Sequence, residues 1–116
     1  MSVSTATTMA SSVEQAVDDI KGQFGEISPN LVLFFASSRY DPALISRGMH
    51  DAFPGAQVIG CSTAGEIASG RVLKDAIVAM AFDERTVSGV ACSVVTDVTS
   101  PDSLMGAVRE IEEKIG

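Results

Sequence analysis

Apolar residues follow two kinds of spacing along this chain, and the two alternate. Spacing of three and four residues, typical of a helix with one buried face, runs through residues 13–24, through 42–53 and onward from 101. Short apolar runs at 31–36, 56–60, 75–82 and 87–95 predict strands. The alternation predicts an α/β fold.

Each predicted helix has its own start signal. Ser11 with Glu14 three residues later forms a capping-box pattern, and Gly25 can end that first helix. Asp41 and Ser100 each stand before a proline, an N-cap followed by proline at the first helical position. The last helix is expected to bury a stripe of four apolar side chains, namely Leu104, Val108, Ile111 and Ile115.

The strands predict a mixed β-sheet with a parallel βαβ unit and flanking helices. The run 31–36 has no polar alternation, which indicates a strand covered on both faces. With the helix 42–53 and the strand 56–60 it forms a βαβ unit, and a right-handed crossover makes the two strands parallel. The runs 75–82 and 87–95, joined by 83–86, predict an antiparallel hairpin.

The carboxyl ends of the two parallel strands share one rim, where ligands of open α/β sheets bind. Polar residues 37–41 leave the first strand there, and the small-residue stretch 60–67 leaves the second. Glycines in that stretch leave backbone N–H groups uncovered. We expect a ligand-binding site at this rim, made by Ser37, Arg39, Tyr40, Gly60, Cys61, Ser62, Thr63, Gly65 and Glu66.

Several of these side chains have two interpretations. Arg39 could pair with a ligand carboxylate or be a solvated loop charge, and Tyr40 could contact a ligand or pack over the helix start. Glu66 could receive a ligand's amino group or cap the loop's own N–H groups. Arg71 is a weaker second cation.

Known catalytic motifs do not match this stretch. The run 60–64 lacks the second glycine of a nucleophile elbow, and Gly65 with Glu66 lacks the lysine of a phosphate loop. Cys61 could be a nucleophile activated by His50, or a small buried side chain at a strand end. Cys92 lies inside the predicted strand 87–95, and we interpret it as a structural residue. We expect a protein that is not an enzyme.

Composition limits the class of protein. The 116 residues, 46% of them apolar, suffice for one core, and we expect a flexible N-terminus over residues 1–10 before a domain over 11–116. A formal charge of −7 argues against nucleic acid as a partner. Neither a secretory signal nor a membrane-spanning run is evident, and the two cysteines form no zinc or disulfide pattern. We expect a cytoplasmic protein with no membrane partner.

The runs 31–37, 40–41, 53–56 and 58–67 closely resemble the start of the FIST domain, a bacterial sensory module named for F-box and intracellular signal transduction. The run Gly60-Cys61-Ser62-Thr63-Ala64-Gly65-Glu66 is the most specific part of this resemblance, which covers residues 10 to 100 in order. Because FIST proteins have two halves and are longer than this chain, the resemblance implies that the chain is the N-terminal part of such a domain.

The resemblance also implies a function. It implies a sensory domain that binds a small molecule, an amino acid or a related metabolite, and reports to a signalling protein such as a histidine kinase or a cyclic-nucleotide enzyme. Some FIST-like proteins are haem-based nitric oxide sensors. The alternative function is therefore a haem-based sensor with His50 as the axial ligand of the iron. Without haem, His50 would be a solvated surface residue. A third reading is a protein-interaction module that self-associates through edge strands and an uncovered sheet face.

Overall fold

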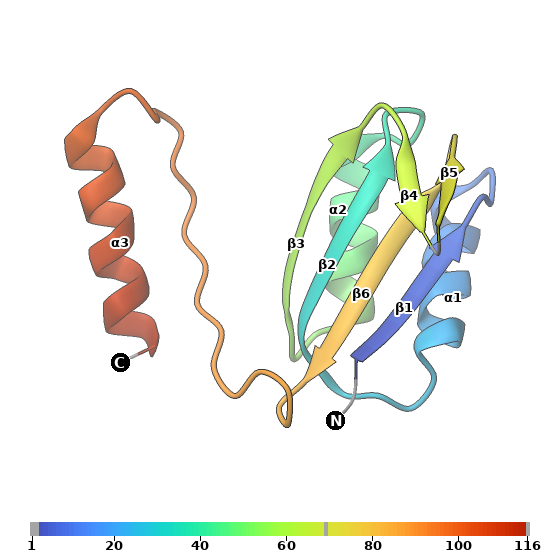
Figure 1. The fold of residues 1–116 in the computed structure, drawn as a ribbon, viewed down its shortest axis with the longest axis horizontal. Coiled ribbons are helices and arrows are strands. Elements are labelled where there is room, and N and C mark those ends of the chain that lie inside the picture. The colour runs from blue at the N-terminus through green and yellow to red at the C-terminus, as the bar shows by residue number, and fades with distance from the viewer. Residues whose placement is uncertain (1–2, 69, 116) are drawn as a thin grey trace.

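The computed structural model describes residues 3–68 and 70–115. Its elements, in chain order, are β1 (Val3–Thr8), α1 (Val13–Phe24), β2 (Pro29–Ser37), α2 (Pro42–Ala52), β3 (Gln57–Thr63), β4 (Glu66–Ala68), β5 (Arg71–Leu73), β6 (Ile77–Asp83) and α3 (Pro101–Ile115). A mixed sheet has the strand order β1-β6-β2-β3, and β4 pairs with β5 in a separate ribbon (Figure 1). The predicted fold class is confirmed.

Local signals set the ends of α1 and α2. The Ser12 side chain accepts a hydrogen bond from the backbone N–H of Gln15, so the N-cap of α1 lies one residue later than the predicted Ser11. Gly25, with a φ of 68°, ends the helix. Asp41 accepts hydrogen bonds from the first N–H groups of α2, as predicted.

Strand β6 lies inside the sheet. It pairs antiparallel with β1 on one side and with β2 on the other, while β2 and β3 are parallel, as the βαβ prediction required. Residues 3–8 therefore form a full strand, whereas the sequence predicted a flexible terminus there. The division of the chain into domains otherwise stays a prediction.

The predicted strand 87–95 is wrong, because the structure shows no strand between Asp83 and Pro101. A hairpin partner needs a free edge of β6, and β1 and β2 occupy both edges. The chain turns instead, with the N–H groups of Thr86 and Val87 bonded to the carbonyl of Asp83, and continues in extended form to α3.

Only one face of the sheet is covered by helices. The core lies between this face and helices α1 and α2, which both lie behind the sheet in Figure 1, and includes Val32, Phe34, Ala36, Ala79, Ile20 and Met49. On the opposite face Phe35 is 43% and Ile59 44% exposed. The prediction that residues 31–36 are covered on both faces is therefore wrong.

Helix α3 forms where predicted and starts with Ser100, whose hydroxyl accepts from the N–H of Ser103. It lies apart from the sheet in Figure 1 and has no buried residue, so the expected burial of Leu104, Val108, Ile111 and Ile115 is wrong. Three residues of its apolar stripe are exposed, namely Leu104, Val108 and Ile115, while Ile111 is half-buried.

Gly60 offers a test of the core. A methyl group at Gly60 would overlap the ring of Phe34, whereas one at Gly22 in α1 would meet open space. We expect Gly60→Ala to lower the free energy of unfolding by about 1–3 kcal/mol through overpacking. Gly22→Ala should raise it by about 0.5–1 kcal/mol, since alanine favours the helix. Urea unfolding of the two variants checks this, and equal effects would contradict the packing argument.

Candidate functional site

The rim of the sheet differs from the predicted loop. Strand β3 continues through Thr63, which pairs with Ser37 at the end of β2. Cys61, Ser62 and Thr63 are therefore strand residues, and the predicted loop at 60–67 is wrong for them. The connection to β4 is only two residues long, Ala64 and Gly65. A methyl group built on Gly65 makes ordinary contact with the carbonyl of Leu73, so close packing does not require glycine there.

Glu66 is buried, with 2% of its surface exposed. Its carboxylate accepts hydrogen bonds from the Thr63 hydroxyl and from the backbone N–H of Ala76, the latter at 3.1 Å. Ala76 directly precedes β6, so the carboxylate ties the end of β3 and the start of β4 to the start of β6. Of the two roles predicted for Glu66, this is the capping of the protein's own groups.

Arg39 and Tyr40 hold the loop between β1 and α1. The Tyr40 hydroxyl donates to the carbonyl of Ala10 at 2.5 Å, and Nη2 of Arg39 donates to the same carbonyl at 2.9 Å and to the Tyr40 hydroxyl at 3.1 Å. Tyr40 is 3% exposed. Ser37 is buried and accepts from the N–H of Arg39. These side chains therefore bond to the protein itself.

A hollow of about 630 Å³ lies beside α2, at the β3 edge of the sheet. Most of its floor comes from residues of β2 and β3 on the helix-covered face, and its wall comes from α2. The lining includes Phe34, Ala36, Val58, Gly60, Cys61, Ser62, Ser46, Arg47 and His50. We call this space the α2–β3 hollow.

The structure brings only part of the predicted site to this hollow. Gly60, Cys61 and Ser62 line it. So does His50, which was predicted as a haem ligand, as a base for Cys61 or as a solvated surface residue, and which is exposed. The other predicted residues do not line it, namely Ser37, Arg39, Tyr40, Thr63, Gly65 and Glu66. The side chain of Arg71 lies outside the described part of the structure.

Sequence reasoning missed Ser46 and Arg47. The helical spacing within α2 could have indicated them. Ile45 and Met49 mark the buried side of this helix. Ala43, Arg47 and His50 follow the same helical spacing on another side of the helix, and all three line the hollow. Both halves of the βαβ unit therefore contribute to one concave surface.

The lining combines an apolar floor with a few polar groups, which is typical of small-molecule sites. The Arg47 guanidinium can form two parallel hydrogen bonds with a carboxylate. The hydroxyls of Ser46 and Ser62 can donate or accept, and the His50 imidazole can do either. The hollow is suited to a small molecule with an anionic group and a modest apolar part.

Cys61 is exposed, so the expectation of a small buried side chain is wrong. It pairs with Phe35 in the β2–β3 register, and Phe35 belongs to the face without helices. Cys92 is half-buried and lies in the segment between β6 and α3, outside any strand.

Comparison with protein families matches the FIST N domain over residues 30–115. The chain belongs to the FIST family. The match runs from β2 to α3, so it includes both walls of the α2–β3 hollow. FIST domains are sensory domains of signal transduction. Comparison with curated proteins gives no match.

Of the helices that the structure describes, none has the length and apolar character to cross a membrane.

Glu66 provides a test of the rim. Glu66→Ala removes the acceptor of two hydrogen bonds and leaves the buried N–H of Ala76 unpaired. We expect the free energy of unfolding to fall by about 1–3 kcal/mol. Glu113→Ala, on the exposed surface of α3, should change it by less than about 0.5 kcal/mol. Chemical unfolding measures both, and a Glu66→Ala variant as stable as the parent would refute this structural role.

Proposed function

We propose that this FIST domain binds a small anionic metabolite of the amino-acid class in the α2–β3 hollow, and reports its presence to a signalling protein. The observation that supports this is the position of Arg47 and His50 of α2 along the same hollow as Gly60 and Ser62 of β3. The proposed role is recognition without catalysis.

Each part of an amino acid has a complementary group in the lining. Arg47 would bind the carboxylate, and the hydroxyls of Ser46 and Ser62 would accept from the amino group. The apolar side chain would rest on Phe34 and Val58. Gly60 keeps the Phe34 ring in place under the ligand, since any larger residue would displace the ring.

Ligand binding can change the position of the rest of the domain through a movement of α2. Helix α2 approaches α1 closely at Gly48, where a built Cβ atom would lie 3.1 Å from Cγ2 of Val17. A ligand bound to Arg47 and His50 acts on the opposite side of that tight contact. A shift of α2 would therefore displace α1, because packed helices move as units. The signalling protein that reads this shift is of the class implied by the family, a histidine kinase or a cyclic-nucleotide enzyme.

The ligand site is tested by thermal unfolding of the chain in the presence of each of the standard amino acids and of short dicarboxylates. We expect at least one probe to raise the melting temperature in a concentration-dependent way, because a ligand that binds only the folded state stabilises it. If no probe of this class binds, the amino-acid assignment is wrong.

Arg47→Gln should weaken binding of that probe about tenfold or more, since it removes a charged hydrogen-bonding partner. Arg109→Gln on α3, outside the hollow, is the matched control and should leave the dissociation constant within about twofold. Isothermal titration calorimetry measures both. An equal loss of affinity in the two variants would show that the net charge of the protein, and not a specific site, determines binding.

Haem is the second candidate, because His50 is the single histidine of the chain and lines the hollow. The residues fit in part: His50 offers a nitrogen ligand, Phe34 and Val58 offer apolar contact, and Arg47 offers a cation for a propionate. Bound iron would supply the affinity for a diatomic gas.

Titration with haem, followed by visible absorption, separates this candidate from a sensor without haem. Haem binding through the hollow should give a sharp Soret band that His50→Ala removes. Ser46→Ala, which alters the same wall without removing a nitrogen ligand, should keep that band. A spectrum that is the same for the parent and for His50→Ala would exclude His50 as the axial ligand.

A further inference from the structure

Charged side chains are distributed unevenly around the α2–β3 hollow. The sequence has 15 acidic residues against 8 basic ones, yet among the residues that the structure describes no aspartate or glutamate lines the hollow. Its basic groups are Arg47 and His50, which both come from α2. The hollow is therefore a basic surface on an acidic protein.

The acidic residues closest to these groups in the sequence are not part of the lining. Asp41 caps the first turn of α2, where its carboxylate accepts from the N–H groups of Ala43 and Leu44 at 2.9 and 3.2 Å. Asp51 follows Arg47 by one helical turn, and of the side chains that the structure describes these two form no ion pair. A carboxylate for Arg47 would therefore have to come from a ligand.

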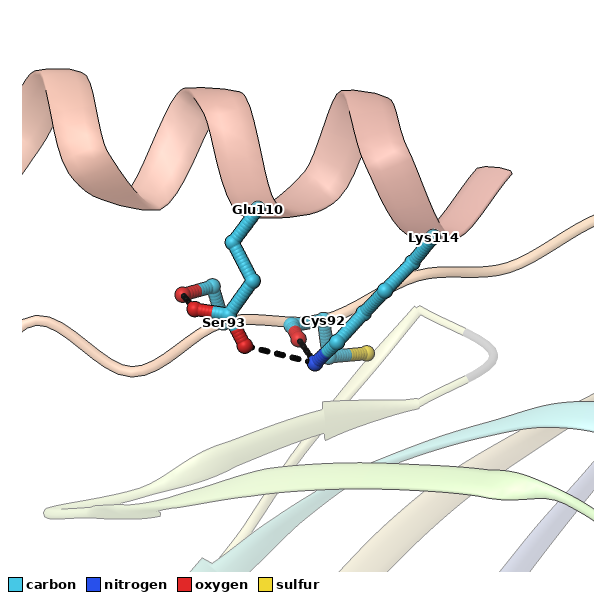
Figure 2. Close-up of polar contacts among 4 residues, drawn as sticks. All are labelled: Cys92, Ser93, Glu110 and Lys114. Atoms are coloured by element: carbon cyan, nitrogen blue, oxygen red, sulfur yellow. Dashed lines mark hydrogen bonds and ion pairs between the residues drawn. The ribbon is translucent and has the colours of Figure 1, made fainter. Parts of the chain in front are cut away.

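Lys114 of α3 shows how a basic side chain is paired elsewhere in this chain. Figure 2 shows Lys114 and Glu110 reaching the segment at Cys92 and Ser93. Nζ of Lys114 lies 2.7 Å from the Glu110 carboxylate and donates to the Cys92 carbonyl at 3.1 Å. The hydrogen bonds from Lys114 and Ser93 hold the pKa of Glu110 below its usual value. Within the described residues, the Arg47 guanidinium has no comparable partner.

His50 is a neighbour of two other lining residues on α2. It lies one helical turn after both Ser46 and Arg47, a spacing that places Cβ atoms about 5–6 Å apart. Ser46 and Arg47 are adjacent in sequence, so they do not face each other. Helix α2 therefore offers two separate donor groups to the hollow, the guanidinium of Arg47 and the imidazole of His50 with the Ser46 hydroxyl beside it.

We propose that the ligand of the α2–β3 hollow is a short dicarboxylate, which rests on the proposed function of this hollow and narrows its ligand class to acidic amino acids and their relatives without an amino group. One carboxylate binds the Arg47 fork, and the second accepts hydrogen bonds from the His50 ring N–H and the Ser46 hydroxyl. The carbon chain between them rests on Phe34 and Val58.

The charge of the lining favours a dicarboxylate over a neutral amino acid. A neutral amino acid brings an ammonium group, which pairs most strongly with a carboxylate, and the described lining has none. An amide in place of the second carboxylate still accepts a hydrogen bond from His50, but a neutral acceptor forms a weaker bond than a charged one. Arg47 and His50 are exposed, so water and salt screen these contacts and the preference is modest.

Two matched pairs of probes test this proposal by isothermal titration calorimetry, succinate against succinamate and glutamate against glutamine. The members of each pair have the same size and differ in whether the second group is a carboxylate or an amide. We expect the dicarboxylate to have a dissociation constant about tenfold lower in each pair. Added sodium chloride should reduce this preference, because it screens exposed charges.

Variants of α2 assign the second carboxylate to its partner. His50→Ala should weaken glutamate binding about tenfold and glutamine binding less than about threefold, so that most of the preference is lost. His50→Gln, whose amide still donates, should retain part of it. Leu44→Ala is the matched control, since Leu44 is exposed on α2 and does not line the hollow, and it should leave both constants unchanged.

Equal binding of the dicarboxylates and their amides would overturn the dicarboxylate assignment and leave a site for amino acids in place. A preference that persists in full in His50→Ala would overturn the role of His50. If neither these probes nor any amino acid binds, the proposed function of the hollow fails as well.

Discussion

The antiparallel pairing of β6 with both β1 and β2 is the interaction on which the rest of the structure depends. It joins the N-terminal strand to the βαβ unit, and it buries Ala79 and Ala81 under the two helices. It also leaves no edge of β6 for the residues that follow. The segment after Asp83 therefore leaves the sheet, and the separation of α3 from the sheet follows from the position of β6 as much as from the sequence of the segment itself.

A second constraint is that both covering helices lie on one side. α1 follows β1 and α2 follows β2, and both pack on the face that contains Val32 and Phe34. The other face keeps its apolar side chains without a helix. Two of the three strand pairings in this sheet are antiparallel, and antiparallel sheets commonly keep one face in contact with water. The parallel pair β2–β3 is the part of the sheet where the uncovered face is most exposed, at Phe35 and Ile59.

Short-range signals were predictable from the sequence, and long-range partners were not. Asp41 with Pro42, and Gly25, fixed helix ends because each acts on neighbouring backbone groups. The apolar run at 31–36 indicated a strand but not which faces are covered, since its composition is equally apolar on both. The partners of Tyr40 and Glu66 could not be predicted either: Ala10 and Ala76 contribute only backbone groups, which carry no side-chain signal in a sequence. Arg47 could have been found from the spacing within α2.

Strand β3 has one face on the α2–β3 hollow and the other on the side of the sheet without helices. Gly60 and Ser62 line the α2–β3 hollow from the helix-covered face, Ile59 lies on the other face, and Cys61, which alternates with Gly60 and Ser62 along the strand, also borders the hollow. β3 is also an edge strand, bonded along one side only, so its position is less constrained than that of β2 or β6. A ligand that contacts both α2 and β3 would therefore act on a strand that is held along one edge only, and on the helix that packs closely against α1 at Gly48.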